Sequence, residues 1–156
     1  MARELIYGRN AVLESLRARR RTFHRLLLAE ALRPDPRLDE IQAMADRAGL
    51  TVELRPRDSL DELISQNHQG VILEANPFPY FASVIPDEPP PNSILLALDE
   101  LEDPRNVGAL IRTAEAVGVD GLVIPERRAV GITPAVVNAS SGAVEHLRVA
   151  RETNLA

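Results

Sequence analysis

Residues 94–118 read ILLALDELEDPRNVGALIRTAEAVG, which is a short apolar run, a polar turn and a stretch with helical spacing. The continuous apolar run Ile94–Leu98 predicts a buried parallel strand, because such strands are covered on both faces. The segment Arg105–Val117 predicts a helix that ends at Gly118, since its apolar residues recur every three or four positions. These inward residues are Val107, Leu110, Ile111, Ala114 and Val117. α/β proteins bind ligands at the carboxyl ends of such strands, so the polar turn is the leading candidate for a functional site.

The residues after this segment continue the same alternation. Gly121–Ile124 and Leu147–Ala150 are further predicted strands. Thr133-Pro134 combines a capping residue with a proline at the first helical position, so it predicts the start of another helix. Residues 94–156 are therefore expected to form a parallel α/β unit. Three strands and two helices bury only a small core, so we expect this unit to be the first part of a larger domain.

Residues 1–76 alternate in a similar way and predict a small α/β unit whose sheet is covered by helices. The expected strands are Phe23–Ala29, Thr51–Leu54 and Gly70–Ala75. Three helices are expected, one capped by Asn10, one running from Asp35-Pro36 to Gly49, and one from about Ser59 to Ser65.

A proline-rich stretch separates the two units, with six of the 12 prolines between Pro77 and Pro91. Proline has no backbone N–H and a fixed φ, so this stretch is neither a helix nor a central strand. We expect residues 77–93 to be a semi-rigid linker. The aromatic residues Phe78, Tyr80 and Phe81 within it are candidates either for stacking on bases or for covering the domain junction.

The composition narrows the class of protein. No apolar run approaches the roughly 20 residues needed to cross a bilayer. The chain has no cysteine, which excludes disulfides, cysteine-based zinc sites and thiol nucleophiles. A cytoplasmic protein is expected. The net charge of −5 argues against a strongly basic nucleic-acid binder, but every one of the 18 basic residues is arginine, which suits phosphate contacts.

Two clusters of charged residues each allow two interpretations. A basic cluster at the end of the first predicted helix either contacts an RNA backbone or complements the helix dipole; it comprises Arg17, Arg19, Arg20, Arg21 and Arg25. An acidic run either binds Mg²⁺ or is a solvated loop; it comprises Asp99, Glu100, Glu102 and Asp103. The solvated loop is favoured, and no metal site is expected.

The polar turn places Asn106 and Gly108 at the expected helix N-terminus, whose free N–H groups and dipole favour anions. Arg112 lies one to two turns further along the helix, so the three residues together are able to hold a phosphate or a ribose. The alternative is structural, with Asn106 as a cap, Gly108 as a packing residue and Arg112 as a surface charge. Spacing alone favours the structural alternative.

A resemblance to a known family shifts this balance. The first signature motif of the SpoU/TrmH-type RNA ribose 2'-O-methyltransferases, members of the SPOUT superfamily, resembles Asn106-x-Gly108-x-x-x-Arg112-x-Ala114-x-Ala116-x-Gly118. The segments Asn138–Ala143 and Val149–Leu155 resemble the next stretch of the same domain. Near the N-terminus, Tyr7–Val12 and His68–Val71 are similar to the N-terminal domain of members that modify large-subunit ribosomal RNA.

The resemblance implies both a fold and an activity. The implied fold is a small ribosomal-protein-like α/β RNA-binding domain followed by the first part of an α/β-knot domain with a parallel sheet. The implied reaction transfers a methyl group from S-adenosylmethionine to a ribose 2'-hydroxyl, with 23S ribosomal RNA as the expected substrate. Asn106 and Arg112 are the expected catalytic residues. The resemblance favours RNA contact for the basic cluster, and the other expected RNA contacts are Arg9, His68, Gln69 and Arg105. A homodimer is implied for the full-length protein.

One departure from the family limits these expectations. The second and third family motifs, which form the donor pocket, do not occur in the chain. The S-adenosylmethionine site is therefore expected mostly beyond residue 156, and this segment alone is expected to be inactive. The alternative is a non-catalytic RNA-binding module or truncated relative, and a generic α/β nucleotide binder is a third interpretation.

Overall fold

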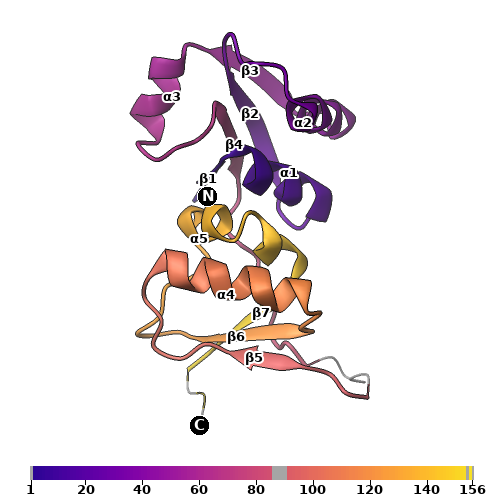
Figure 1. Cartoon of the computed structure of the whole chain (residues 1–156), viewed down its shortest axis with the longest axis vertical. Helices are drawn as coiled ribbons and strands as arrows, with labels where there is room; N and C mark the ends of the chain where they lie inside the picture. The colour runs from indigo at the N-terminus through magenta and orange to yellow at the C-terminus, as the bar shows by residue number, and fades with distance from the viewer. Residues whose placement is uncertain (1, 86–90, 154, 156) are drawn as a thin grey trace. The chain divides into compact units, whose positions relative to one another are not determined.

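The computed structural model describes residues 2–85, 91–153 and 155. The chain forms two compact units that divide between Pro77 and Phe78 (Figure 1). None of the helices in the described residues has both the length and the apolar character that crossing a bilayer requires.

The first unit is a mixed four-stranded sheet with helices on both faces (Figure 1). Its strand order is β1 (Glu4–Tyr7), β4 (Val71–Ala75), β2 (Phe23–Ala29) and β3 (Thr51–Arg55). Strand β4 is antiparallel to both of its neighbours, and β2 is parallel to β3. Its helices are α1 (Arg9–Ala18), α2 (Pro36–Arg47) and α3 (Arg57–Leu63).

Alternation along the strands gives this sheet two apolar faces. Leu27 and Ile72 pack with Leu60 and Ile64, so α3 covers their face. Leu26, one position from Leu27, is fully buried on the opposite face, on which α1 and α2 pack. The predicted sheet covered by helices is therefore confirmed for this unit.

Local capping signals located one helix start correctly and missed another. Asp35 accepts a hydrogen bond from the backbone N–H of Arg37 at 2.8 Å, and α2 begins at Pro36 as predicted. The prediction that Asn10 caps α1 is wrong, because the helix begins at Arg9 after Gly8. The third helix begins about two residues earlier than predicted. The sequence does not predict strand β1, because its four residues show no alternation of apolar and polar side chains. This strand is held in place by pairing with β4.

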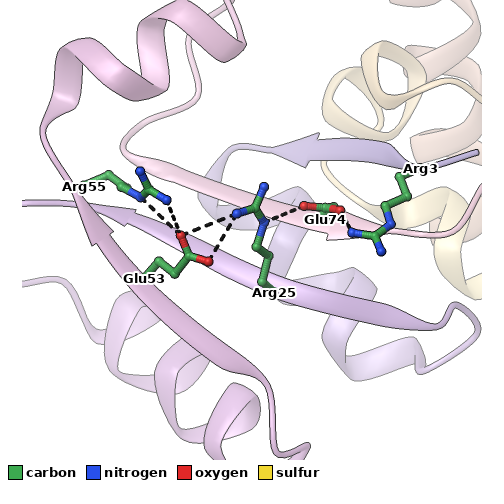
Figure 2. A network of polar contacts seen from close by, with 5 residues as sticks. All are labelled: Arg3, Arg25, Glu53, Arg55 and Glu74. Carbon is green, nitrogen blue, oxygen red and sulfur yellow. Dashed lines mark hydrogen bonds and ion pairs between the residues drawn. The ribbon is translucent and has the colours of Figure 1, made fainter.

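A ladder of alternating charges crosses the first sheet from Arg3, the residue before β1, to Arg55 on β3 (Figure 2). Glu74 on β4 binds both Arg3 and Arg25, although its side chain is only 6% exposed. Glu53 on β3 continues the ladder, binding Arg25 at 3.2 Å and Arg55 at 2.6 Å. The Arg3 and Arg25 guanidinium groups hold the pKa of Glu74 below its usual value, and Arg55 and Arg25 do the same to the pKa of Glu53.

The charge ladder predicts acid sensitivity of the first unit. A carboxyl whose pKa is lower in the folded state stabilises fully above its unfolded pKa, and this contribution disappears as the pH falls through the folded pKa. We therefore expect the free energy of unfolding to fall as the pH drops below about 4.5, the ordinary value for glutamate. Glu74→Gln is expected to lower the free energy of unfolding by about 1–3 kcal/mol at neutral pH, because it removes charge-assisted hydrogen bonds. The free energy of unfolding of this variant should also depend less on pH below about 4.5.

Urea unfolding between pH 3 and 7 measures both effects, and the exposed Glu62→Gln variant is the control. If the free energy of unfolding falls equally at low pH in the wild type and in Glu74→Gln, Glu74 does not contribute to the acid sensitivity.

The second unit is a three-stranded parallel sheet in the order β5 (Leu95–Ala97), β6 (Gly121–Pro125) and β7 (Arg148–Glu152). Helices α4 (Pro104–Ala116) and α5 (Pro134–Ala139) lie on the same side of it (Figure 1), and a short 3-10 helix spans Ala143–His146. The predicted parallel sheet is confirmed. The predicted helix start at Thr133-Pro134 is also confirmed, since Thr133 accepts a hydrogen bond from the N–H of Val136 at 3.4 Å.

Two burial predictions for the second unit are wrong. Ile94 and Leu95 are 53% and 42% exposed, because β5 lies at an edge of the sheet and not within it. On α4, Leu110 and Val117 are 41% and 65% exposed, whereas Val107, Ile111 and Ala114 are buried as predicted. The buried stripe of α4 is therefore narrower than the apolar pattern of its sequence.

The start of the expected linker packs against the second unit. Phe81 forms an isolated parallel bridge with Ala150, and its backbone N–H donates to the carbonyl of Val149 at 2.8 Å. The Tyr80 hydroxyl accepts a hydrogen bond from the N–H of Ile132 at 2.7 Å, and the Arg151 guanidinium lies 5.0 Å from the centre of the Tyr80 ring. Residues 86–90 of the expected linker lie outside the described residues.

Removing the Tyr80 hydroxyl tests how firmly this segment is held. Tyr80→Phe leaves the N–H of the buried residue Ile132 without its acceptor, so we expect a loss of about 1–3 kcal/mol in unfolding free energy. Denaturant unfolding measures the loss, and amide hydrogen exchange should be faster at Ile132. An unchanged unfolding midpoint with unchanged Ile132 exchange would show that the hydroxyl contributes nothing.

Candidate functional site

A pocket of about 510 Å³ lies where the three parallel strands of the second unit end. The loops that follow β5, β6 and β7 meet at this edge because the strands run in the same direction. The lining residues are Asp99, Glu100, Pro125, Arg127, Arg128, Thr153 and Leu155. The pocket therefore combines acidic, basic and hydroxyl groups.

Helix α4 starts beside this edge, but its cap differs from the predicted one. Asp103 is the N-cap and accepts a hydrogen bond from the N–H of Arg105 at 2.8 Å, with Pro104 as the first helical residue. Asn106 is the third helical residue and is exposed. Its side chain is therefore free of the capping role and lies in the first turn, where N–H groups without intrahelical partners favour anions.

Gly108 has the packing role that the structural alternative assigned to it. A Cβ atom at this position would lie 2.5 Å from the Cβ of Ala139 and 2.8 Å from the backbone nitrogen of Ser140. Only glycine permits α4 to approach the end of α5 so closely. The glycine of the motif therefore sets the position of α4.

Arg112 is exposed on α4 and lines a shallow hollow of about 410 Å³ with Ala109, Thr113, Ala116 and Val117. This hollow is separate from the pocket at the strand ends. Arg112 follows Asn106 by six residues, which corresponds to about 9 Å along a helix and about 120° around it. The described residues therefore do not bring these two side chains together.

The two N-terminal motifs, about 60 residues apart in the chain, do meet in the first unit. The backbone N–H of Arg9 donates to the side-chain oxygen of Gln69 at 3.0 Å. The Arg9 guanidinium binds Asp35 at 2.6 Å. Exposed Gln69 and half-buried Arg9 thus lie at one end of the sheet, beside Arg37, which also binds Asp35 at 2.8 Å.

His68 lies inside this cluster instead of on its surface. Its side chain is 1% exposed, and its Nδ1 accepts a hydrogen bond from the N–H of Gly70 at 3.0 Å. The ring proton is therefore on Nε2, which donates to Asp61 at 2.7 Å. His68 in this position orients the loop that presents Gln69 and does not offer its own ring to RNA.

The basic cluster at the end of α1 is largely neutralised within the chain. Arg17 binds Glu14 and Glu40, both within 2.7 Å, and Arg25 belongs to the charge ladder. The Arg21 side chain is 0% exposed and binds Glu4 at 2.7 Å, so it cannot reach a phosphate without breaking that ion pair.

Arg19 and Arg20 complete the cluster. Arg19 is exposed at the end of α1 in a left-handed conformation, and Arg20 is partly buried with contacts of its own. The helix-dipole interpretation and an RNA contact by Arg19 are compatible with these positions.

The acidic run does not assemble with other ligands. Among the described residues, no group of three or more histidine, aspartate or glutamate side chains is arranged to hold a metal ion. Asp103 is used as a helix cap, and Glu100 binds Arg128 at 3.2 Å.

Polar residues of the strand-end pocket that the sequence did not predict are Arg127, Arg128 and Thr153. Arg127 and Arg128 follow β6, Thr153 follows β7, and no spacing pattern links these residues to the motif on α4. The parallel order of the strands was the available signal, because it brings the ends of all three strands to one edge.

A mixed-sheet unit followed by a parallel-sheet unit with charged loops at its carboxyl edge defines a two-unit α/β protein. Residues 5–81 match a family model described as RNA 2'-O ribose methyltransferase substrate binding, and residues 93–156 match the SpoU rRNA Methylase family. The chain belongs to the SpoU/TrmH family of RNA 2'-O-ribose methyltransferases.

Individual relatives agree with this assignment. The Bacillus subtilis protein YacO, whose name places it among TrmH family tRNA/rRNA methyltransferases, is 41% identical over 98% of this chain. A crystal structure of an RNA 2'-O ribose methyltransferase is 26% identical over 97% of the chain, with a TM-score of 0.72. An AdoMet-bound rRNA methyltransferase from Sinorhizobium meliloti shares the fold at 22% identity, with 96% of the chain covered and a TM-score of 0.74.

The chain is shorter than these relatives. It spans 62% of the length of YacO, 56% of the first crystal structure and 54% of the Sinorhizobium meliloti structure. Four of the residues that line the strand-end pocket are charged, and two, Pro125 and Leu155, are apolar residues that could contact an adenine ring. We therefore assign no part of the methyl donor to this pocket.

Proposed function

We propose that the protein containing this chain transfers a methyl group from S-adenosylmethionine to a ribose 2'-hydroxyl of 23S ribosomal RNA. In this proposal residues 1–76 bind the RNA, residues 77–93 connect the units, and residues 94–156 form the first part of the methyltransferase domain. The observation that carries it is the exposure of both Asn106 and Arg112 on α4, with Asn106 in the first helical turn and Arg112 lining a separate hollow further along the helix.

The chemistry of Arg112 favours a positioning role over a role as a base. A guanidinium has a pKa above about 12 and stays protonated in proteins. A fixed positive charge at the ribose lowers the energy of the alkoxide that develops as the 2'-hydroxyl loses its proton. Asn106, in the first turn of α4, offers an amide to a phosphate or hydroxyl group of the bound RNA. Methyl transfer needs alignment of the reacting oxygen with the methyl group, so orientation by these residues is a large part of catalysis.

The exposed surface of α4 supports a homodimer of the full-length protein. Leu110 on α4 and Val117, which lines the hollow at Arg112, expose apolar side chains, and exposed apolar patches mark interaction surfaces. A second subunit packed on this surface would enclose Arg112 and supply the partners that this chain does not place beside it.

The RNA contacts are proposed at two places. In the first unit, Arg9 and Gln69 present polar groups at one end of the sheet, with exposed Arg19 at the end of α1. In the second unit, Arg105 is exposed one residue before Asn106. Phosphate contacts by such arginines position the RNA without reading its sequence. His68 supports the first of these places through its loop.

The experiment is methyl transfer by the full-length protein to unmodified RNA. The protein is incubated with tritiated S-adenosylmethionine and either 23S ribosomal RNA transcript or a pool of unmodified tRNA. Incorporation into the 23S transcript, followed by recovery of a 2'-O-methylated nucleoside, is the expected result. Incorporation only into tRNA would reject 23S ribosomal RNA as the substrate. Tight RNA binding without methylation of either RNA would reject the enzyme in favour of an RNA-binding module.

A further inference from the structure

The strand-end pocket contains an arginine that the family motif does not include. Arg127 lies on the loop after β6, is exposed, and lines the pocket. Within residues 2–85, 91–153 and 155, its side chain has no ion pair or hydrogen bond. In the first unit, by contrast, arginines such as Arg17, Arg21 and Arg25 are bound to carboxylates of the same chain.

We propose that Arg127 binds a backbone phosphate of the RNA, and that Asp99 across the pocket accepts a hydrogen bond from a ribose hydroxyl of the same nucleotide. The inference rests on the proposed function, since it identifies where the RNA lies at the methyltransferase unit. It adds two binding residues to Asn106 and Arg112.

The loops of the pocket are held in place by contacts with one another. The backbone N–H of Val130 donates to the carbonyl of Leu101 at 2.9 Å, which joins the loop after β6 to the loop after β5. Glu100 and Arg128 form an ion pair between the same two loops, and both have left-handed backbone conformations, with φ of 52° and 57°. The backbone contact fixes the position of Arg127, since an ion pair this exposed contributes little stability.

The charges that remain in the pocket suit a nucleotide. Glu100 and Arg128 oppose each other, so Arg127 and Asp99 are the charged lining residues left for a ligand. A guanidinium binds a phosphodiester through two parallel hydrogen bonds, and a carboxylate accepts from sugar hydroxyls. The volume of about 510 Å³ lies within the range of about 300–1,000 Å³ that is typical of small-ligand pockets.

Binding of unmodified 23S transcript to the full-length protein at several salt concentrations tests the phosphate contact. Arg127→Gln should weaken binding about 3- to 10-fold at about 0.1 M salt and reduce the salt slope by about one, because one phosphate contact is lost. Arg127→Lys keeps the charge and should keep the slope. Arg47→Gln is the matched control, since Arg47 is an exposed arginine on α2 of the first unit.

Substitution of Asp99 tests the sugar contact. Asp99→Ala should narrow the preference for RNA over DNA of the same sequence about 3- to 10-fold and leave the salt slope unchanged, because the 2'-hydroxyl distinguishes the two.

The outcomes separate this inference from the proposed function. If the wild-type protein neither binds nor methylates the transcript, the proposed function fails. If the wild-type protein does both, and Arg127→Gln has the wild-type affinity and salt slope, the phosphate contact is wrong. If Asp99→Ala keeps the full preference for RNA, the sugar contact is wrong.

Discussion

Arg112→Ala in the full-length protein is expected to lower the rate of methyl transfer about 100- to 1,000-fold, the usual effect of losing one group that stabilises developing charge. RNA affinity should change little, because the proposed interaction of Arg112 is stronger in the transition state than in the bound substrate. Single-turnover methylation of the 23S transcript measures the rate, and filter binding measures the affinity.

Arg105→Ala is the matched control, since Arg105 is exposed on the same helix, seven residues earlier. As a proposed phosphate contact, its loss should weaken RNA binding and leave single-turnover methylation at saturating RNA nearly unchanged. Arg112→Lys should recover only part of the rate, because an ammonium group lacks the planar fork of a guanidinium. Near-normal methylation by Arg112→Ala would reject the placement of this residue at the reacting ribose.

Gly108→Ala is expected to destabilise the second unit by about 1–3 kcal/mol, although alanine is the better helix former by about 1 kcal/mol. The added Cβ would lie 2.5 Å from Ala139 Cβ and 2.7 Å from the Ala139 carbonyl carbon. Backbone atoms of α5 cannot move aside as a flexible side chain would, so overpacking outweighs the gain in helix propensity. Thermal unfolding of the wild type and the variant measures the difference.

Gly118→Ala separates crowding from backbone strain. Gly118 has a φ of 76°, but no atom lies within 4 Å of a Cβ built there. Gly118→Ala should therefore lower the free energy of unfolding by about 1 kcal/mol, from the left-handed conformation alone. If Gly108→Ala proves more stable than the wild type, α4 and α5 are not in the close contact described.

Several features of this chain follow from residues that are neighbours in the sequence. Asp35 and Thr133 each precede a proline and cap helices α2 and α5, and β2 spans the residues that its apolar run predicts. These signals act over about four residues, so no knowledge of the fold is needed to interpret them. The family motif is also local, since Asn106, Gly108 and Arg112 lie on one helix.

Other features depend on contacts between distant residues. Arg21 was predicted to contact RNA and is instead buried against Glu4, and Gln69 meets Arg9 sixty positions earlier. Arg127 and Asp99 line one pocket because β5 and β6 are parallel neighbours that end at the same edge. Strand order sets these distances, and the amino-acid pattern along one segment carries no information about which segment will lie beside it. The helix starts marked by Asp35-Pro36 and Thr133-Pro134 were therefore predictable, whereas ion-pair partners, exposed edges and pocket walls required the folded chain.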